Sequence, residues 1–167
     1  MRLFIVPKRI KTSVVACIIA SDDRVLLTRR SVHPFHGLWI MPGGKIEHGE
    51  GILPALHREV QEEVGIEIAV EGLIDVYEHV ANGESHDHFV ILYYRATPLS
   101  LALRPDGIEC NEAIWCAAAE LPEYDLAPGT RYILGKIFPQ LSWPAIAASE
   151  VLCSVEEPLA CVPKEVK

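Results

Sequence analysis

The residues best suited to chemistry form one acidic cluster, which contains Glu59, Glu62 and Glu63. On a helix, their spacing of i, i+3 and i+4 confines the three carboxylates to an arc of about 100°, so we expect them to converge. Like charges at this spacing repel, which favours a bound cation, and Mg²⁺ or Mn²⁺ suits carboxylate oxygens. Because magnesium usually bridges carboxylates to phosphates, the cluster predicts a phosphate substrate. The structural alternative is a solvated acidic face on which Arg58 pairs with Glu62.

A helix with defined ends must position this cluster. Pro54 is tolerated only in a first helical turn, and Gly65 suits the left-handed residue just past a helix end. The sequence therefore predicts a helix from about Ile52 to Val64. One stripe of this helix is apolar and should pack on a sheet; it consists of Leu53, Leu56, Val60 and Val64.

The stretch over residues 44–66 reads G-K-I-E-H-G-E-G-I-L-P-A-L-H-R-E-V-Q-E-E-V-G-I. It resembles the Nudix box, G-x5-E-x7-R-E-U-x-E-E-x-G-U, in which U is a bulky aliphatic residue. Every fixed position matches, and the matching residues are Gly44, Glu50, Arg58, Glu59, Val60, Glu62, Glu63, Gly65 and Ile66.

This resemblance implies a hydrolase that uses a divalent metal to cleave a nucleoside diphosphate linked to another group. It implies an orienting ion pair between Glu50 and Arg58, whose guanidinium would also offset repulsion among the acids. The metal ligands that it implies are Glu59, Glu62, Glu63 and the carbonyl of Gly43.

Candidate substrate contacts precede the box. The pattern R-x-x-x-P-x-x-G-x-W-x-x-P-G-G resembles Nudix members that bind phosphate through an arginine at a strand end, and we expect Arg30 rather than Arg29 to do so. The alternative is a surface arginine without a ligand. Trp39 has two interpretations, an aromatic that stacks on a base or ribose and a core tryptophan.

A further acid is expected after the box. The stretch E-x-x-W-x-x-x-x-E-L, which begins at Glu112, resembles the C-terminal part of Nudix domains, where a loop often supplies an additional carboxylate. Either Glu109 or Glu112 fits that role, and each could equally be a solvent-exposed residue. Metal-activated water would attack a phosphorus atom, and the candidate proton acceptors are Glu62, Glu109 and Glu112.

Three functions remain open at this stage. The stretch over residues 30–44 and the run H-D-H-F-V-I-L-Y-Y resemble the branch that hydrolyses ADP-ribose and other nucleotide-sugars, which we favour. The alternatives are a nucleoside triphosphate pyrophosphohydrolase that removes damaged nucleotides and a catalytically inactive nucleotide-sensing module.

The order of apolar runs and turn residues indicates an α/β fold. We expect an α/β/α sandwich with a mixed β-sheet, as the Nudix resemblance also implies. The predicted elements are a hairpin of residues 13–20 and 24–28, strands at 66–70, 73–80 and 88–96, a turn at 81–87, a strand within 108–117 and a helix from about 127 to 138.

Composition bounds the class of protein. The length of 167 residues suits one Nudix domain over residues 1–138, followed by an extension of unknown role over 139–167. A formal net charge of −8 argues against nucleic acid as a partner and favours a small nucleotide. Five cysteines without a C-x-x-C pair, and no apolar run of 18 residues, predict a soluble cytoplasmic protein. A homodimer is compatible with the sequence.

Overall fold

The computed structural model describes residues 10–80 and 87–144 of the chain. Residues 81–86 of the predicted turn and residues 145–167 of the C-terminal extension therefore lie outside the described residues. Two helices and seven strands form the described part, together with a short 3-10 helix, η1 (Ala118–Glu123), that the sequence did not predict. None of the described helices is long and apolar enough to cross a membrane.

The strands form two sheets. The four-stranded sheet has the order β4-β1-β6-β5, in which β1 and β6 are parallel and the other pairs antiparallel. The three-stranded sheet has the antiparallel order β3-β2-β7. The strand bounds are β1 Lys11–Ile18, β2 Arg24–Arg30, β3 Trp39–Ile40, β4 Gly43–Lys45, β5 Ile68–Val80, β6 His88–Pro98 and β7 Cys110–Ala117.

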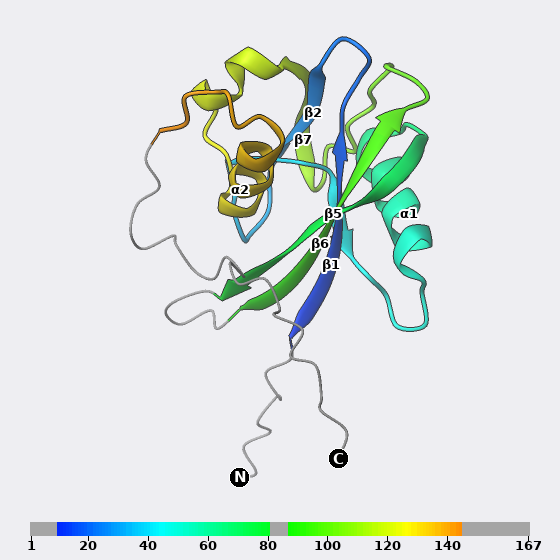
Figure 1. The fold of residues 1–167 in the computed structure, drawn as a ribbon. Helices are drawn as coiled ribbons and strands as arrows, with labels where there is room; N and C mark the ends of the chain where they lie inside the picture. The colour runs from blue at the N-terminus through cyan, green and yellow to red at the C-terminus, as the bar shows by residue number, and fades with distance from the viewer. Residues whose placement is uncertain (1–9, 81–86, 145–167) are drawn as a thin grey trace, which may run out of the picture.

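Helices cover the strands from two sides, as the α/β/α prediction requires. Figure 1 shows α1 (Ile52–Val64) on one side of β1, β5 and β6, and α2 (Pro128–Ile137) on the other. Two separate groups of buried side chains accompany the helices, one with Leu56 and Val60 and the other with Ile133 and Leu134. The mixed α/β fold is therefore confirmed.

The predicted hairpin between the first two strands is mostly wrong. A tight turn does connect them, with hydrogen bonds between Ala20 and Arg24 and from the Asp23 amide to Ala20. The strands then diverge into different sheets, and the bridge between Ile19 and Val25 links them. The reason is that β4 and β6 already occupy both edges of β1.

The strand after α1 is longer than predicted. The two short strands expected at residues 66–70 and 73–80 are one strand, β5, which pairs with β6 along its length. Register shifts between Val70 and Gly72 and between Leu73 and Asp75 accommodate the interruption. Such bulges bend a strand without ending it, which the polar residues in the sequence did not reveal.

Helix α1 has the predicted bounds, and its C-cap Gly65 is left-handed with φ 69°. Its apolar stripe is correct except at the first turn, where Leu53 is 43% exposed while Ala55 is buried. Leu53 lies on the same side of the helix as the buried stripe, but it belongs to the first turn, where Ile52 is exposed as well. Burial therefore depends on position along the helix axis as well as on angle.

Candidate active site

Two glycines bring the backbone of β4 against neighbouring groups. A Cβ on Gly43 would lie 2.2 Å from the carbonyl oxygen of Val14, because β4 pairs closely with β1. A Cβ on Gly44 would lie 2.2 Å from Oε2 of Glu59 on α1. Both positions require glycine, and the Glu59 carboxylate consequently rests directly over the backbone of β4.

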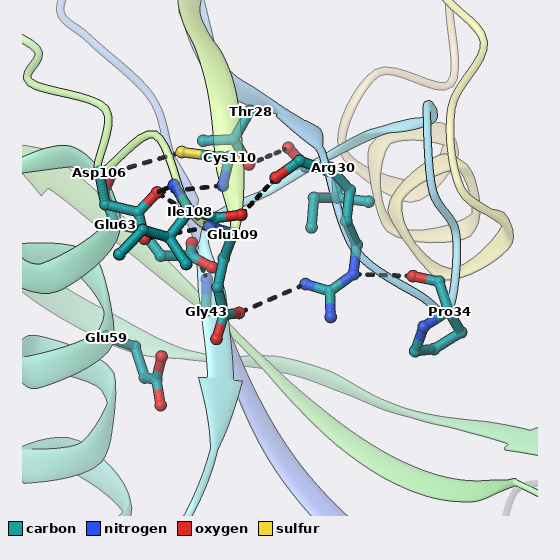
Figure 2. Close-up of polar contacts among 12 residues, drawn as sticks. Thr28, Arg30, Pro34, Gly43, Glu59, Glu63, Asp106, Ile108, Glu109 and Cys110 are labelled. Carbon is teal, nitrogen blue, oxygen red and sulfur yellow. Dashed lines mark hydrogen bonds and ion pairs between the residues drawn. The ribbon is translucent and has the colours of Figure 1, made fainter.

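Glu63 is a buried carboxylate at the end of α1. Its side chain is 3% exposed, and its Oε2 accepts a hydrogen bond of 3.0 Å from the amide of Gly43 (Figure 2). Burial raises the pKa of Glu63 to about 8, the Gly43 amide opposes this shift, and the negative charges of Glu59 and Glu109 add to it. A nearby cation would therefore stabilise the ionised form of Glu63.

Arg58 binds several acids of the Nudix-like stretch at once. Its Nε and Nη2 donate to the two oxygens of Glu50 at 2.8 and 2.9 Å, a bidentate pair. Its Nη1 donates to Glu59 at 2.8 Å and to Glu62 at 3.1 Å. The bond from Arg58 lowers the pKa of Glu50 to about 2. Both proposed pairings of Arg58, with Glu50 and with Glu62, are thus present together.

The three acids do not point to one spot as we predicted. Glu59 and Glu62 share Nη1 of Arg58, whereas Glu63 faces the amide of Gly43. Among the described residues, no group of three or more His, Cys, Asp or Glu side chains is arranged to hold a metal ion. The physical reason is that two different donors stabilise the like-charged carboxylates, Arg58 for Glu59 and Glu62 and the Gly43 amide for Glu63.

The donor set of this site still fits a hard divalent cation. Its side-chain donors are carboxylate oxygens, which suit magnesium or manganese. Burial raises the pKa of Glu59 despite its bond to Arg58, and it raises that of Glu63 further. A cation held by Glu59 and Glu63 would offset this cost, and the missing side chain at Gly44 is what allows the Glu59 carboxylate to approach the backbone of β4.

Arg30 and Glu109 face the same region from the other sheet. Arg30 Nε donates to the carbonyl of Pro34 at 2.7 Å, and its Nη1 lies 3.8 Å from Oε2 of Glu109 (Figure 2). Both residues line a cleft that also contains Glu59 and Glu62. The structure thus brings Arg30 and Glu109 together with the acids of α1.

Arg29, Glu112 and Trp39 lie elsewhere. Arg29 Nη1 donates to Glu112 at 3.1 Å, and both side chains are about half exposed, outside the cleft lining formed by the described residues. Trp39 packs edge-on against Tyr124, with ring centres 5.5 Å apart, among the core residues beneath α2. Trp39 is partly buried and is not among the described residues that line the cleft.

Asp106 was missed by the sequence reasoning. Its Oδ1 accepts hydrogen bonds from the amides of Ile108, Glu109 and Cys110 at 2.9, 3.1 and 3.1 Å. Its own amide donates to the carbonyl of Glu63 at 3.0 Å. The Asp-Gly pair at 106–107, a strong turn signal, could have identified this turn.

Charged and aromatic side chains together line the cleft. Its volume is about 1320 Å³, and its aromatic lining comes from β5, β6, the loop after β2 and the loop before α1. Phe35 makes an edge contact with His79, which in turn lies 6.5 Å from the ring of Phe89. Burial lowers the pKa of His79, which favours the neutral ring. The aromatic residues in the cleft lining are His33, Phe35, His48, Tyr77, Phe89 and Tyr93.

Comparisons with known proteins agree on the family. A family model described as "NUDIX domain" matches residues 9–137. The chain is similar to the crystal structure of a MutT NUDIX hydrolase from Burkholderia pseudomallei, with a TM-score of 0.71 and 29% identity over 77% of this chain and 98% of that one.

Three curated relatives carry different activities in their names. An 8-oxo-dGDP phosphatase from Homo sapiens is 33% identical over 65% of this chain, which spans only 33% of that relative. A CTP pyrophosphohydrolase from Escherichia coli is 33% identical over 69% of this chain and 82% of the relative. An ADP-ribose pyrophosphatase from Methanocaldococcus jannaschii is 42% identical over 36% of each.

Proposed function

The chain belongs to the Nudix family of hydrolases, which act on phosphorus-containing anhydrides of nucleotide derivatives, and we propose that it cleaves the diphosphate linkage of a nucleoside diphosphate derivative. One observation carries this proposal: Glu59 and Glu62 of α1 line a single cleft together with Arg30, Glu109 and several aromatic side chains. The substrate that we favour is ADP-ribose or another nucleotide-sugar.

Nudix hydrolases generally use a divalent metal, and we assign Mg²⁺ or Mn²⁺ to the acidic residues of α1 beside this cleft. The residues that would hold it are Glu59, Glu62, Glu63 and the carbonyl of Gly43. When bound, such a metal acidifies water and neutralises charge on the transferring phosphoryl group. The pair of Glu50 and Arg58 fixes the loop before α1 and orients the acids beside it.

Glu109 is the best placed proton acceptor. It lies in the cleft, its side chain is half exposed, and it is close enough to Glu59 and Glu63 to raise the pKa of both. Glu112 lies outside the cleft lining and pairs with Arg29, while Glu62 is held by Arg58. We therefore assign proton transfer from the attacking water to Glu109.

The aromatic side chains of the cleft suit a planar base. Phe35 and Phe89 offer aromatic surface there, and a neutral His79 lies between them. Arg30 also lines the cleft, and its guanidinium would bind a substrate phosphate. A volume of about 1320 Å³ exceeds the range of about 300–1,000 Å³ typical of small-molecule sites, which supports a substrate with a second group beyond the nucleotide.

A nucleoside triphosphate is the second candidate substrate. The relatives named for CTP and 8-oxo-dGDP match about two thirds of this chain, whereas the relative named for ADP-ribose matches 36% of it. Overall similarity therefore supports the triphosphate or oxidised-nucleotide alternative, and the size of the cleft supports the nucleotide-sugar.

One screen separates these alternatives. The purified protein is incubated with nucleotide-sugars, dinucleotides, triphosphates and oxidised deoxynucleotides, each with Mg²⁺, with Mn²⁺ and with a chelator, and the products are identified by mass spectrometry. We expect ADP-ribose to give AMP and ribose phosphate only with metal. Pyrophosphate release from triphosphates alone would favour the second candidate, and no product from any compound would favour the inactive sensing module. The predicted cytoplasmic location and homodimer need separate measurements.

A further inference from the structure

Two neighbouring arginines of β2 form two arginine–glutamate pairs in different surroundings. Arg29 pairs with Glu112 on the outer face, and Arg30 pairs with Glu109 in the cleft. A register shift between Arg29 and Arg30 lies at this point of the β2–β7 ladder. The chain thus offers one pair in the cleft and a chemically matched pair outside it.

The inner pair is the looser one. Arg30 is 17% exposed, and its Nε is bound to the carbonyl of Pro34 at 2.7 Å, which fixes the plane of the guanidinium. The Nη1 atom lies 3.8 Å from Oε2 of Glu109, beyond hydrogen-bond distance, and Glu109 is 50% exposed. The guanidinium is therefore held by the protein, while the carboxylate opposite it is only weakly held.

The backbone of Glu109 is fixed although its side chain is not. Asp106 accepts a hydrogen bond from the Glu109 amide (Figure 2). The Ser31 amide donates a hydrogen bond to the Glu109 carbonyl at 2.9 Å. The amide of Asp106 and the thiol of Cys110 both donate to the carbonyl of Glu63, which ties the turn to α1. Any rearrangement of Glu109 is therefore confined to rotation of its side chain.

Glu109 interacts electrostatically with one cation, Arg30, and with two acids, Glu59 and Glu63. Its negative charge contributes to the raised pKa of both Glu59 and Glu63, whereas Arg30 lowers that of Glu63. A substrate phosphate is a stronger and more highly charged partner for a guanidinium than a half-exposed carboxylate 3.8 Å away.

We propose that Glu109 is the exchangeable counter-ion of Arg30: a substrate phosphate takes its place on the guanidinium, and the displaced carboxylate is released from that partner. This inference rests on the proposed phosphate-containing substrate. Binding of the substrate phosphate and release of Glu109 are then a single event, because the two anions compete for one guanidinium. The outer pair of Arg29 and Glu112 has no such role.

The test measures ADP binding by nuclear magnetic resonance titration in the presence of a chelator, so that neither metal nor turnover contributes. Four proteins form a double-mutant cycle: wild type, Glu109→Gln, Arg30→Gln and the double variant. We expect Glu109→Gln to tighten ADP binding about threefold or more when Arg30 is present, and by less than about 1.5-fold when Arg30 is replaced. The matched variant Glu112→Gln should leave the affinity within about 1.5-fold of wild type.

Equal tightening in both Arg30 backgrounds would mean that Glu109 acts only through long-range repulsion, and the exchange would be overturned. Unchanged or weaker ADP binding by Glu109→Gln, or no response of the wild type to millimolar ADP, would also overturn it. The proposed hydrolysis is tested separately, because it fails when metal-loaded protein forms no product whatever the outcome of this titration.

Discussion

Arg58 and Arg30 face the same acidic cleft, but their surroundings differ. Arg58 donates hydrogen bonds to three glutamates and to the carbonyl of Lys45. Arg30 donates to the carbonyl of Pro34 and stands 3.8 Å from Glu109. The first arginine is saturated by its own chain, while the second has a loose anionic partner that a phosphate could replace.

The difference separates organisation from recognition. A saturated guanidinium fixes the loop and helix that carry the acids, and its replacement should disturb metal binding first. A loosely paired guanidinium is available to a ligand, and its replacement should disturb substrate binding first. Substitutions of the two arginines and of their acidic neighbours can test this division.

The largest effect is expected at Glu63. Glu63→Gln keeps the shape and the acceptor for the Gly43 amide but removes a proposed metal ligand. We expect turnover of the best substrate to fall by ~10² or more, since each loss of about 1.4 kcal/mol costs tenfold in rate. Stability without metal should hold at pH 7, where a pKa of about 8 keeps Glu63 mostly protonated, and should rise by a few tenths of a kcal/mol above about pH 8, where one like charge beside Glu59 is removed.

Kinetics and thermal melting with and without Mg²⁺ check this prediction together. The wild type should gain more melting temperature from Mg²⁺ than Glu63→Gln does, since a ligand that binds only the folded state stabilises it. Glu112→Gln serves as the control because that carboxylate pairs with Arg29 outside the cleft. Wild-type turnover together with a wild-type response to Mg²⁺ in Glu63→Gln would refute the metal assignment.

The sequence predicted the part of the site that a single helix carries. The bounds of α1 and its left-handed cap at Gly65 follow from local rules, and the acids lie within that one element. The direction of each carboxylate did not follow, because it depends on donors from β4 and on Arg58. Spacing fixes an angle on the helix but not a side-chain rotamer.

The residues contributed by other elements were harder to predict. Glu109 and Glu112 were equivalent candidates in the sequence, and their positions relative to the β2–β7 ladder separate them, since Glu112 pairs with Arg29 while Glu109 precedes β7. The separation of β1 and β2 into two sheets also depends on long-range pairing that a turn signal cannot reveal. Non-local register, rather than local propensity, limited the prediction.

The second prediction concerns the saturated arginine. Arg58→Lys keeps the positive charge but loses the bidentate bond to Glu50 and the simultaneous bonds to Glu59 and Glu62. We expect the apparent affinity for Mg²⁺ to weaken by ~10–100-fold, with a smaller change in KM at saturating metal. Activity measured against Mg²⁺ concentration provides the check. A substrate KM that changes more than the metal dependence would reverse the roles of the two arginines.

The third prediction concerns the loosely paired arginine. Arg30→Ala should raise KM or lower kcat/KM of the best substrate by about tenfold, because a charge-assisted bond to phosphate is lost. The dependence on Mg²⁺ should stay as in wild type. Arg29→Ala, which removes the arginine of the outer pair, is the matched control and should change kcat/KM less than about twofold. Equal losses in the two variants would remove Arg30 from the substrate site.

The smallest effect is expected for an ion pair outside the cleft lining, which shows how a purely structural pair behaves. Asp75 on β5 accepts hydrogen bonds from Tyr132 and Lys136 on α2. Burial raises the pKa of Asp75, but Lys136, the Val76 amide and Tyr132 together outweigh it, so the pKa lies below its usual value of 3.8. A lowered pKa means that the ionised form stabilises the fold above about pH 4, and that this contribution is lost as pH falls through the folded-state pKa.

Asp75→Asn should therefore cost about 0.2–1 kcal/mol at pH 7 and almost nothing at about pH 2, with kcat/KM unchanged. Chemical denaturation of both proteins across this pH range measures the difference. A cost that persists undiminished in acid would assign the stabilisation to packing or neutral hydrogen bonds rather than to charge.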